Sequence, residues 1–213
     1  SGLFFDVMNK DDVYSFRSQA FLDATRLVIG YTDEGSNISK VPQHSRNYHA
    51  LIGESIQSLD SNNPDDVYLI AKHFFAAGSL FSAKAYESNL QAANLACKFH
   101  QFEDSLDLLE KAKISASSSS NSVLDVDVQI AVVHCEKSHI YGKDQSEAAD
   151  FGLEILKEAS LLIFDELAIK VTRALYEARR YDEAIEMAEK LKSAENLSTQ
   201  TEGFHFHGLS ISP

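Results

Sequence analysis

The chain has 213 residues with a formal net charge of −13, no tryptophan, three prolines and nine glycines. This negative charge repels phosphate backbones and anionic lipid headgroups, which argues against direct binding to nucleic acid or to a membrane surface. The scarcity of turn residues argues against a many-stranded fold and favours long helices.

The two cysteines and the hydropathy pattern bear on the cellular compartment. Cys97 and Cys135 lie in apolar, helix-periodic stretches, so we expect reduced, buried thiols rather than a disulfide framework. No run of about 18 apolar residues occurs, and no basic segment followed by an apolar one opens the chain. We therefore expect no membrane span and a cytoplasmic protein. The opening Ser1-Gly2-Leu3 lacks a start methionine, and we expect a piece of a longer protein.

The N-terminal part predicts two helices around a long loop. Apolar residues at a period of 3.6 predict a helix over 10–29, and the polar, aperiodic stretch 31–45 predicts a loop. A second helix is expected to end at the turn 60–64. Its apolar stripe is Tyr48, Leu51, Ile52, Ile56 and Leu59.

The remaining pattern is helical with short breaks, as expected for antiparallel neighbours. The predicted segments are 65–77, 80–98, 101–114, 123–141, 146–158, 161–178 and 181–193, with YGKD at 141–144 and RRYDE at 179–183 as turns. The serine tract 115–122 predicts a loop, either a linker or a phosphorylation site. The tail from Asn196 ends in FHFHGLSISP, which is read as a short strand that caps the last helix, docks on a neighbouring molecule or is disordered.

A repeat links three of these segments. Phe102-Glu103-Asp104-Ser105 aligns with Tyr181-Asp182-Glu183-Ala184, 79 residues later, and Ser146-Glu147-Ala148 fits between them. The alignment places Leu109 opposite Ala188, Ala112 opposite Leu191 and Ala96 opposite Leu175. These steps are near the helix-turn-helix repeat of about 34 residues with its aromatic and alanine positions.

Small residues are needed where two antiparallel helices cross closely, and Ala184 and Ala83 are the candidates. We expect an all-α, tetratricopeptide-like array of helical hairpins with about nine helices. Residues 1–45 would form an N-terminal helix and loop, 46–195 the repeats and 196–213 a polar tail.

A family resemblance rests on three motifs. Arg46-x-x-His49-x-x-Ile52, Ala71-x-His73-Phe74-x-x-Ala77-Gly78 and the later Ala83, Tyr86, Ala92, Ala96, Leu109 and Ala112 resemble the helical repeats of STAND and AAA-related signalling ATPases. Tyr14-Ser15-Phe16-Arg17-Ser18 with Phe21 and Ala24 is similar to the winged-helix linker before such repeats, although that family often has a histidine where Ser18 stands. The resemblance implies a regulatory arm found in transcription activators, cyclases and sensor kinases. No P-loop occurs, since neither residues 35–40 nor Gly142-Lys143 supplies its pattern, and we expect no nucleotide binding.

Candidate chemical groups are more simply explained by structure. On a helix, His134 and His139 point in different directions, so they and Cys135 are not expected to share a metal. His205 and His207 share a strand face but are only two ligands, and His73 lacks a nearby nucleophile. The carboxylates Asp65, Asp66, Glu103 and Asp104 suit helix N-termini, and Glu186, Glu189 and Lys190 suit a solvated face.

Two functions remain. The first is a non-catalytic protein-interaction arm that binds a protein or peptide, including segments of its own parent chain, in a groove whose residues the sequence does not identify. No catalytic residue, cofactor or metal is expected. The alternative is an inducer-sensing domain in which a small molecule enters between helices, near a set of aromatic residues: Phe74, Phe75, Phe81, Tyr86 and Phe99.

Overall fold

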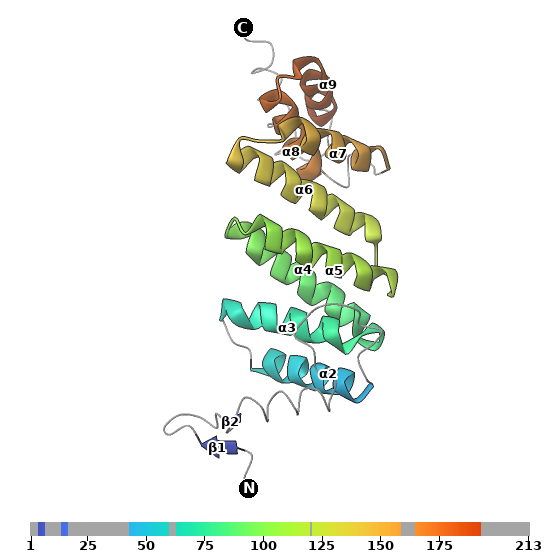
Figure 1. Ribbon diagram of the computed structural model, residues 1–213. Coiled ribbons are helices and arrows are strands. Elements are labelled where there is room, and N and C mark those ends of the chain that lie inside the picture. Colours follow the sequence, from blue (N-terminus) through green and yellow to red (C-terminus); the bar gives the residue numbers. More distant parts are fainter. Residues whose placement is uncertain are drawn as a thin grey trace. The chain divides into compact units, whose positions relative to one another are not determined.

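The computed structural model describes residues 4–6, 14–16, 43–59, 63–119, 121–158 and 165–192. Apart from one short hairpin of strands, these residues form helices joined by short turns (Figure 1). The chain divides into two compact units, Ser1–Phe81 and Ser82–Pro213. The prediction of a predominantly helical fold is confirmed.

The first unit contains β1 (Phe4–Asp6), β2 (Tyr14–Phe16), α2 (Gln43–Ser58), α3 (Pro64–Ala77) and a 3-10 turn (Ser79–Phe81). The strands pair antiparallel with Phe4 opposite Phe16. The helix predicted over 10–29 is therefore wrong at 14–16, where aromatic residues favour a strand pair. The rest of that segment lies outside the described residues.

Local sequence sets the boundaries of α3. The Asn63 side chain accepts a hydrogen bond from the Asp65 amide at 3.2 Å, and Pro64 occupies the first turn, where its missing N–H costs nothing. The helix ends at Gly78, whose φ of 84° is a conformation that glycine adopts without strain. The prediction of a helix over 65–77 is confirmed to within one residue.

The interface between α2 and α3 uses small residues rather than the predicted apolar stripe. Tyr48, Leu51 and Leu59 are 56%, 58% and 73% exposed, whereas Ala50 and Gly53 are buried. A Cβ on Gly53 would lie 3.1 Å from the Phe74 ring, so this glycine allows the two helices to approach closely. The periodicity gave the helix correctly and its buried face wrongly, because the tight crossing selects side-chain size over hydrophobicity.

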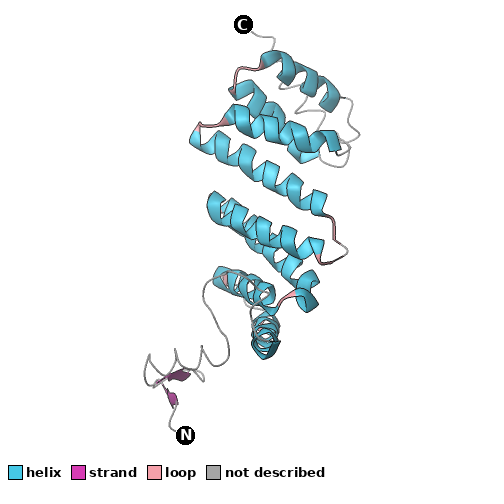
Figure 2. Cartoon of the chain, turned by 45° about the vertical axis from the view of Figure 1, so that its right-hand side comes forward, coloured by secondary structure: helices cyan, strands magenta, loops and turns pink. Residues whose placement is uncertain are grey.

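The second unit contains α4 (Ser82–Lys98), α5 (Phe102–Ser117), α6 (Val123–Tyr141), α7 (Gln145–Glu158), α8 (Asp165–Glu177) and α9 (Tyr181–Lys192). Each helix packs on the next, and α6 also packs on α8. The pairing of α4 with α5 is visible from both viewpoints (Figure 1, Figure 2). These bounds agree with the predicted ones to within two residues, with two exceptions: α5 continues through Ser117 into the tract expected to be a loop, and the predicted start of α8 at 161–164 lies outside the described residues.

The continuation of α5 has a local cause. The hydroxyls of Ser115 and Ser117 donate to the carbonyls of Lys111 and Lys113, four residues earlier, so these serines are satisfied within a helix. The break comes only at the turn before α6. There the Ser122 side chain accepts a hydrogen bond from the Asp125 amide at 3.2 Å and begins the new helix.

The core of the second unit has two parts that meet at α6. Residues of α4, α5 and α6 form one cluster, residues of α6, α7, α8 and α9 form the other, and Phe151 packs against both. Because α6 is buried on several faces by α5, α7 and α8, its apolar residues surround the helix instead of forming one stripe.

Three turns of this unit close in the same way. A residue one or two positions past the helix end is left-handed in each: His100 (φ 59°) after α4, Gly142 (φ 63°) after α6 and Arg179 (φ 62°) after α8. The next amide then bonds a carbonyl five residues back at 2.9–3.2 Å: Gln101 to Ala96, Lys143 to Ser138 and Arg180 to Leu175. This is the Schellman ending of a helix. The middle turn has one more left-handed residue, Asp144, before α7 begins.

The small and aliphatic positions matched by the sequence alignment are buried, whereas at its aromatic position Phe102 is buried and Tyr181 is 44% exposed. Ser105 and Ala184 are fully buried, and so are the aligned residues Ala96, Leu109, Ala112, Leu175, Ala188 and Leu191. Ala184 therefore occupies a helix crossing as expected. Ala83 does not, because it is exposed, and its assignment to a close crossing is wrong. The tail from Asn196 lies outside the described residues. Among the described helices, none has both the length and the apolar character needed to cross a membrane.

Candidate functional site: a hollow at the turn between α6 and α7

A hollow of about 530 Å³ opens where α6 ends and α7 begins. Both helices and the turn between them contribute side chains. Its lining consists of His134, Lys137, Ser138, Tyr141, Lys143, Asp144, Glu147, Ala148 and Phe151. All of these residues belong to the second unit.

The turn itself forms one rim of the hollow. Gly142 reverses the chain in the left-handed conformation, and the Lys143 amide bonds to the Ser138 carbonyl at 3.2 Å. Asp144 then adds a second left-handed residue, which short polar side chains tolerate better than most. The two equivalent turns lack this second left-handed residue. Here Lys143 and Asp144 both line the hollow.

Aromatic rings contribute to the lining of the hollow. The half-buried Phe151 ring meets the His134 ring nearly edge-on, with centroids 5.5 Å apart, and buried Ala148 also lines the hollow. Tyr141 meets Phe102 edge-on with centroids 5.6 Å apart, and 55% of Tyr141 is exposed. The hollow therefore offers apolar ring surface that solvent reaches.

The charges of the hollow are unevenly paired. Lys137 donates to Glu103 Oε1 at 2.6 Å, which neutralises that lysine. Among the described residues, Lys143, Asp144 and Glu147 have no salt-bridge partner and are exposed. Burial, and then the nearby Lys137 charge, lowers the pKa of His134, so this imidazole is neutral at pH 7 and can accept a hydrogen bond. Two unpaired carboxylates thus face one unpaired cation.

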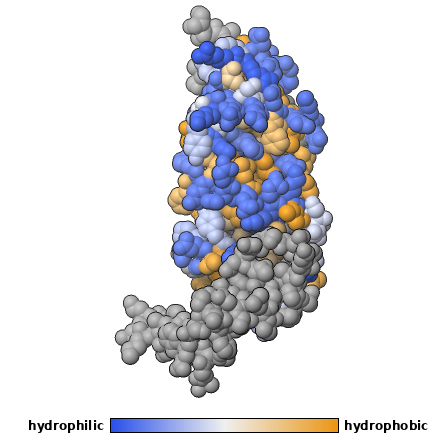
Figure 3. Space-filling view, in the orientation of Figure 1, coloured by the Kyte–Doolittle hydropathy of each residue, from blue (hydrophilic) through white to orange (hydrophobic). Residues whose placement is uncertain are grey.

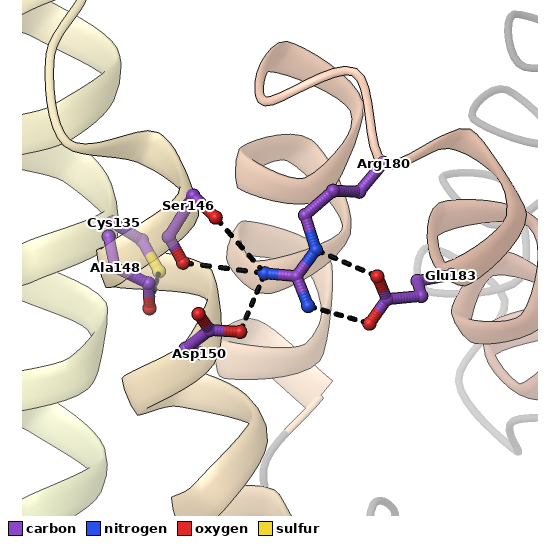
Figure 4. Close-up of polar contacts among 6 residues, drawn as sticks. All are labelled: Cys135, Ser146, Ala148, Asp150, Arg180 and Glu183. Atoms are coloured by element: carbon purple, nitrogen blue, oxygen red, sulfur yellow. Dashed lines mark hydrogen bonds and ion pairs between the residues drawn. The ribbon is translucent and has the colours of Figure 1, made fainter.

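Arg180 fixes the start of α7, and with it the position of Glu147. Its guanidinium donates to both oxygens of Glu183 at 2.7 Å and to Asp150 Oδ1 at 2.6 Å (Figure 4). A longer contact of 3.3 Å reaches the Ser146 hydroxyl. These hydrogen bonds lower the pKa of Glu183. A planar donor with several N–H groups can hold two helix starts together in this way.

A second polar cluster lies in the first unit. His49 of α2 and His73 of α3 are buried, with their Nδ1 atoms 2.8 Å apart. One ring donates and the other accepts, so at least the accepting imidazole is neutral. Burial, the His49 charge and Lys72 lower the pKa of His73 to about 4, in keeping with this pairing. His73 is thus a core residue with a histidine partner, and the sequence did not predict that partner.

His134, Cys135 and His139 of α6, the residues considered as metal ligands, lie in three different environments. Cys135 is buried with its Sγ 3.7 Å from the Ala148 carbonyl oxygen, and burial raises its pKa to about 12. His139 bonds Glu177 of α8 at 2.6 Å, and His134 lines the hollow. Within the part of the chain that the structure describes, no three His, Cys, Asp or Glu residues converge on a metal position.

The other candidates take structural positions. Asp65, Asp66, Glu103 and Asp104 stand in the first turns of α3 and α5, and Glu186 pairs with Lys190 at 2.8 Å on α9. His205 and His207 lie outside the described residues. Of the aromatic residues expected to surround an inducer, Phe74 stacks with Phe81 in the first unit, Tyr86 is partly buried against the core of the second, and Phe99 is exposed.

The sequence did not identify the hollow, although it marked the YGKD turn that forms its rim. The available signal was this turn's combination of an aromatic residue with two opposite charges. Nothing in the periodicity distinguishes Glu147 or Phe151 from ordinary surface and core residues.

Comparison with known proteins yields no match, whether among protein-family models, curated proteins or solved structures.

Proposed function

We propose that this chain is a non-catalytic protein-interaction and regulatory arm, built as a tetratricopeptide-like array of helical hairpins within a larger signalling protein. The observation that carries the proposal is the threefold Schellman turn, with left-handed His100, Gly142 and Arg179 at matching positions. Similar turns that join similar helix pairs are what a repeat architecture requires. Stacked repeats give extended surfaces that suit the binding of peptide segments.

The surface of the second unit supports the same proposal. Phe99, Ile114, Ile140, Tyr141 and Tyr181 are exposed large hydrophobic residues of this unit. Figure 3 shows hydrophobic residues at the surface among hydrophilic ones over the described helices. Apolar and aromatic anchors within a polar surround are typical of protein interfaces. The net charge of −13 favours partners that carry basic residues.

The test is a selection with a defined probe. A phage-displayed library of random dodecapeptides is panned on the immobilised full chain, and enriched peptides are titrated by calorimetry at low salt and at about 0.5 M salt, where exposed charges are strongly screened. The proposal predicts a shared sequence motif and saturable one-to-one binding that survives the higher salt. Enrichment of unrelated sequences whose binding vanishes in salt would contradict it.

The sensor alternative keeps one supporting observation. The hollow's volume of about 530 Å³ lies within the range of small-molecule sites, about 300–1,000 Å³. Four charged side chains line it, however, whereas such sites are mostly apolar. A thermal-shift screen of small metabolites separates the two functions: a saturable rise in melting temperature with one compound class, together with a failed peptide selection, would favour the sensor.

A further inference from the structure

We propose that the hollow between α6 and α7 holds an arginine side chain of the partner segment, with a neighbouring apolar residue of that segment against Tyr141. This inference rests on the proposed peptide-binding function and specifies its site and partner chemistry. Its occupant is a basic peptide segment, and the case for it comes from charge, shape and hydrogen-bonding capacity.

The balance of unpaired charge favours a cation. Asp144 and Glu147 face the hollow without salt bridges to described residues, whereas Lys137 is already engaged by Glu103. Lys143 is the one lining lysine left without such a pair in the described part of the chain. An incoming guanidinium is attracted by two unpaired carboxylates and repelled by one unpaired ammonium group. An incoming carboxylate is repelled by the two carboxylates and attracted only by the ammonium group.

The shape of the lining favours arginine over lysine. A guanidinium is planar, carries five donors and stacks on aromatic faces, whereas an ammonium is a compact, strongly hydrated charge. The hollow combines ring surface at Tyr141 and Phe151 with acceptors at Asp144, Glu147 and the neutral imidazole of His134. Rings and acceptors line the same hollow, which suits a flat donor that is satisfied at its edge and stacked on its face.

The surroundings extend the same chemistry beyond the hollow. Three helices that begin after equivalent turns, α5, α7 and α9, each carry acidic residues in the first turn. Contacts link these starts along one edge: Phe102 with Tyr141, Lys137 with Glu103, and Arg180 with Asp150. Exposed Tyr181 lies at the start of α9 on the same edge. A peptide that spans more than one turn would therefore meet two further exposed carboxylates, Asp104 and Asp182, since Glu103 and Glu183 are already paired with Lys137 and Arg180.

The experiment compares selections on matched proteins. The dodecapeptide library is panned in parallel on the full wild-type chain, on Glu147→Lys and on Glu110→Lys, which makes the same charge change at an exposed position of α5 outside the hollow. Asp144→Asn serves as a second variant, because asparagine tolerates the left-handed backbone. Circular dichroism melts establish that each variant folds.

The expected result is an arginine next to an apolar residue in the peptides enriched on wild type. Their affinity should fall by roughly tenfold or more on Glu147→Lys, fall on Asp144→Asn and stay within about twofold on Glu110→Lys. Replacement of the peptide's arginine by lysine should weaken binding, and replacement by glutamate should abolish it. Enriched peptides without arginine, or peptides bound equally well by Glu147→Lys, would overturn the inference and leave the proposed function standing. A selection without any shared motif would overturn both.

Discussion

Replacement of Gly152 by alanine tests the packing of α7 on α8. A Cβ at this position would lie 2.3 Å from Cγ2 of Val171, well inside ordinary contact, and Val171 is fully buried, so its side chain has little room to turn away. We expect overpacking to cost about 1–3 kcal/mol. The higher helix propensity of alanine offsets about 1 kcal/mol of this cost. Urea denaturation should show a net loss of up to about 2 kcal/mol in the free energy of unfolding.

A double-mutant cycle identifies the cause of that loss. Val171→Ala alone leaves a cavity and should cost about 2 kcal/mol, but it also removes the methyl group that Gly152→Ala would strike. The double variant should therefore be more stable than the sum of the single changes predicts, by about 1 kcal/mol or more. Glu154→Ala, at an exposed position of the same helix, is the control and should change little. Additive single effects within about 0.5 kcal/mol would refute the close approach of the two helices.

Three further predictions concern the register, a turn and the histidine pair. Ala184→Phe should lower the free energy of unfolding by about 1–3 kcal/mol in urea denaturation, whereas Ala83→Phe should change it little. Equal effects of the two substitutions would contradict the repeat alignment that places Ala184 at a helix crossing. Gly142→Ala has space but a φ of +63°, so strain alone should cost about 1 kcal/mol, and an unchanged melt would contradict the left-handed turn. Burial lowers the pKa of His49 and of His73 from 6.5, the latter to about 4. The contribution of this pair to the free energy of unfolding is therefore fully present above pH 6.5 and is lost as the pH falls toward 4. Melts across this range should show the loss, and His73→Gln should flatten it.

The helices were predictable wherever the sequence carries its own start and stop signals. The Asn63 and Ser122 caps and the glycines Gly78 and Gly142 mark ends that agree with the structure to within a residue or two. The buried face was not predictable where size decides it. On α2 the large apolar residues are exposed, and the crossing is made by small ones such as Gly53, a choice that depends on the partner helix and not on the local pattern.

The candidate site was predictable only as a turn. Sequence spacing placed a chain reversal at 141–144, but the hollow depends on three-dimensional facts: the Glu103 contact that neutralises Lys137, and the edge-on packing of Phe151 against His134. Glu103 lies 34 residues from its lysine partner, so no local pattern reveals which charges remain unpaired. Sequence alone could therefore suggest a binding protein without assigning its binding residues.

The most direct test of a peptide-binding arm is an NMR titration of the isotopically labelled full chain with a peptide enriched in the selection. The account predicts saturable shifts of backbone amides in the α6–α7 turn and the first turn of α7, near Gly142, Asp144 and Glu147, with smaller shifts at the starts of α5 and α9. Shifts confined to α2 and α3, or shifts that never saturate, would contradict it.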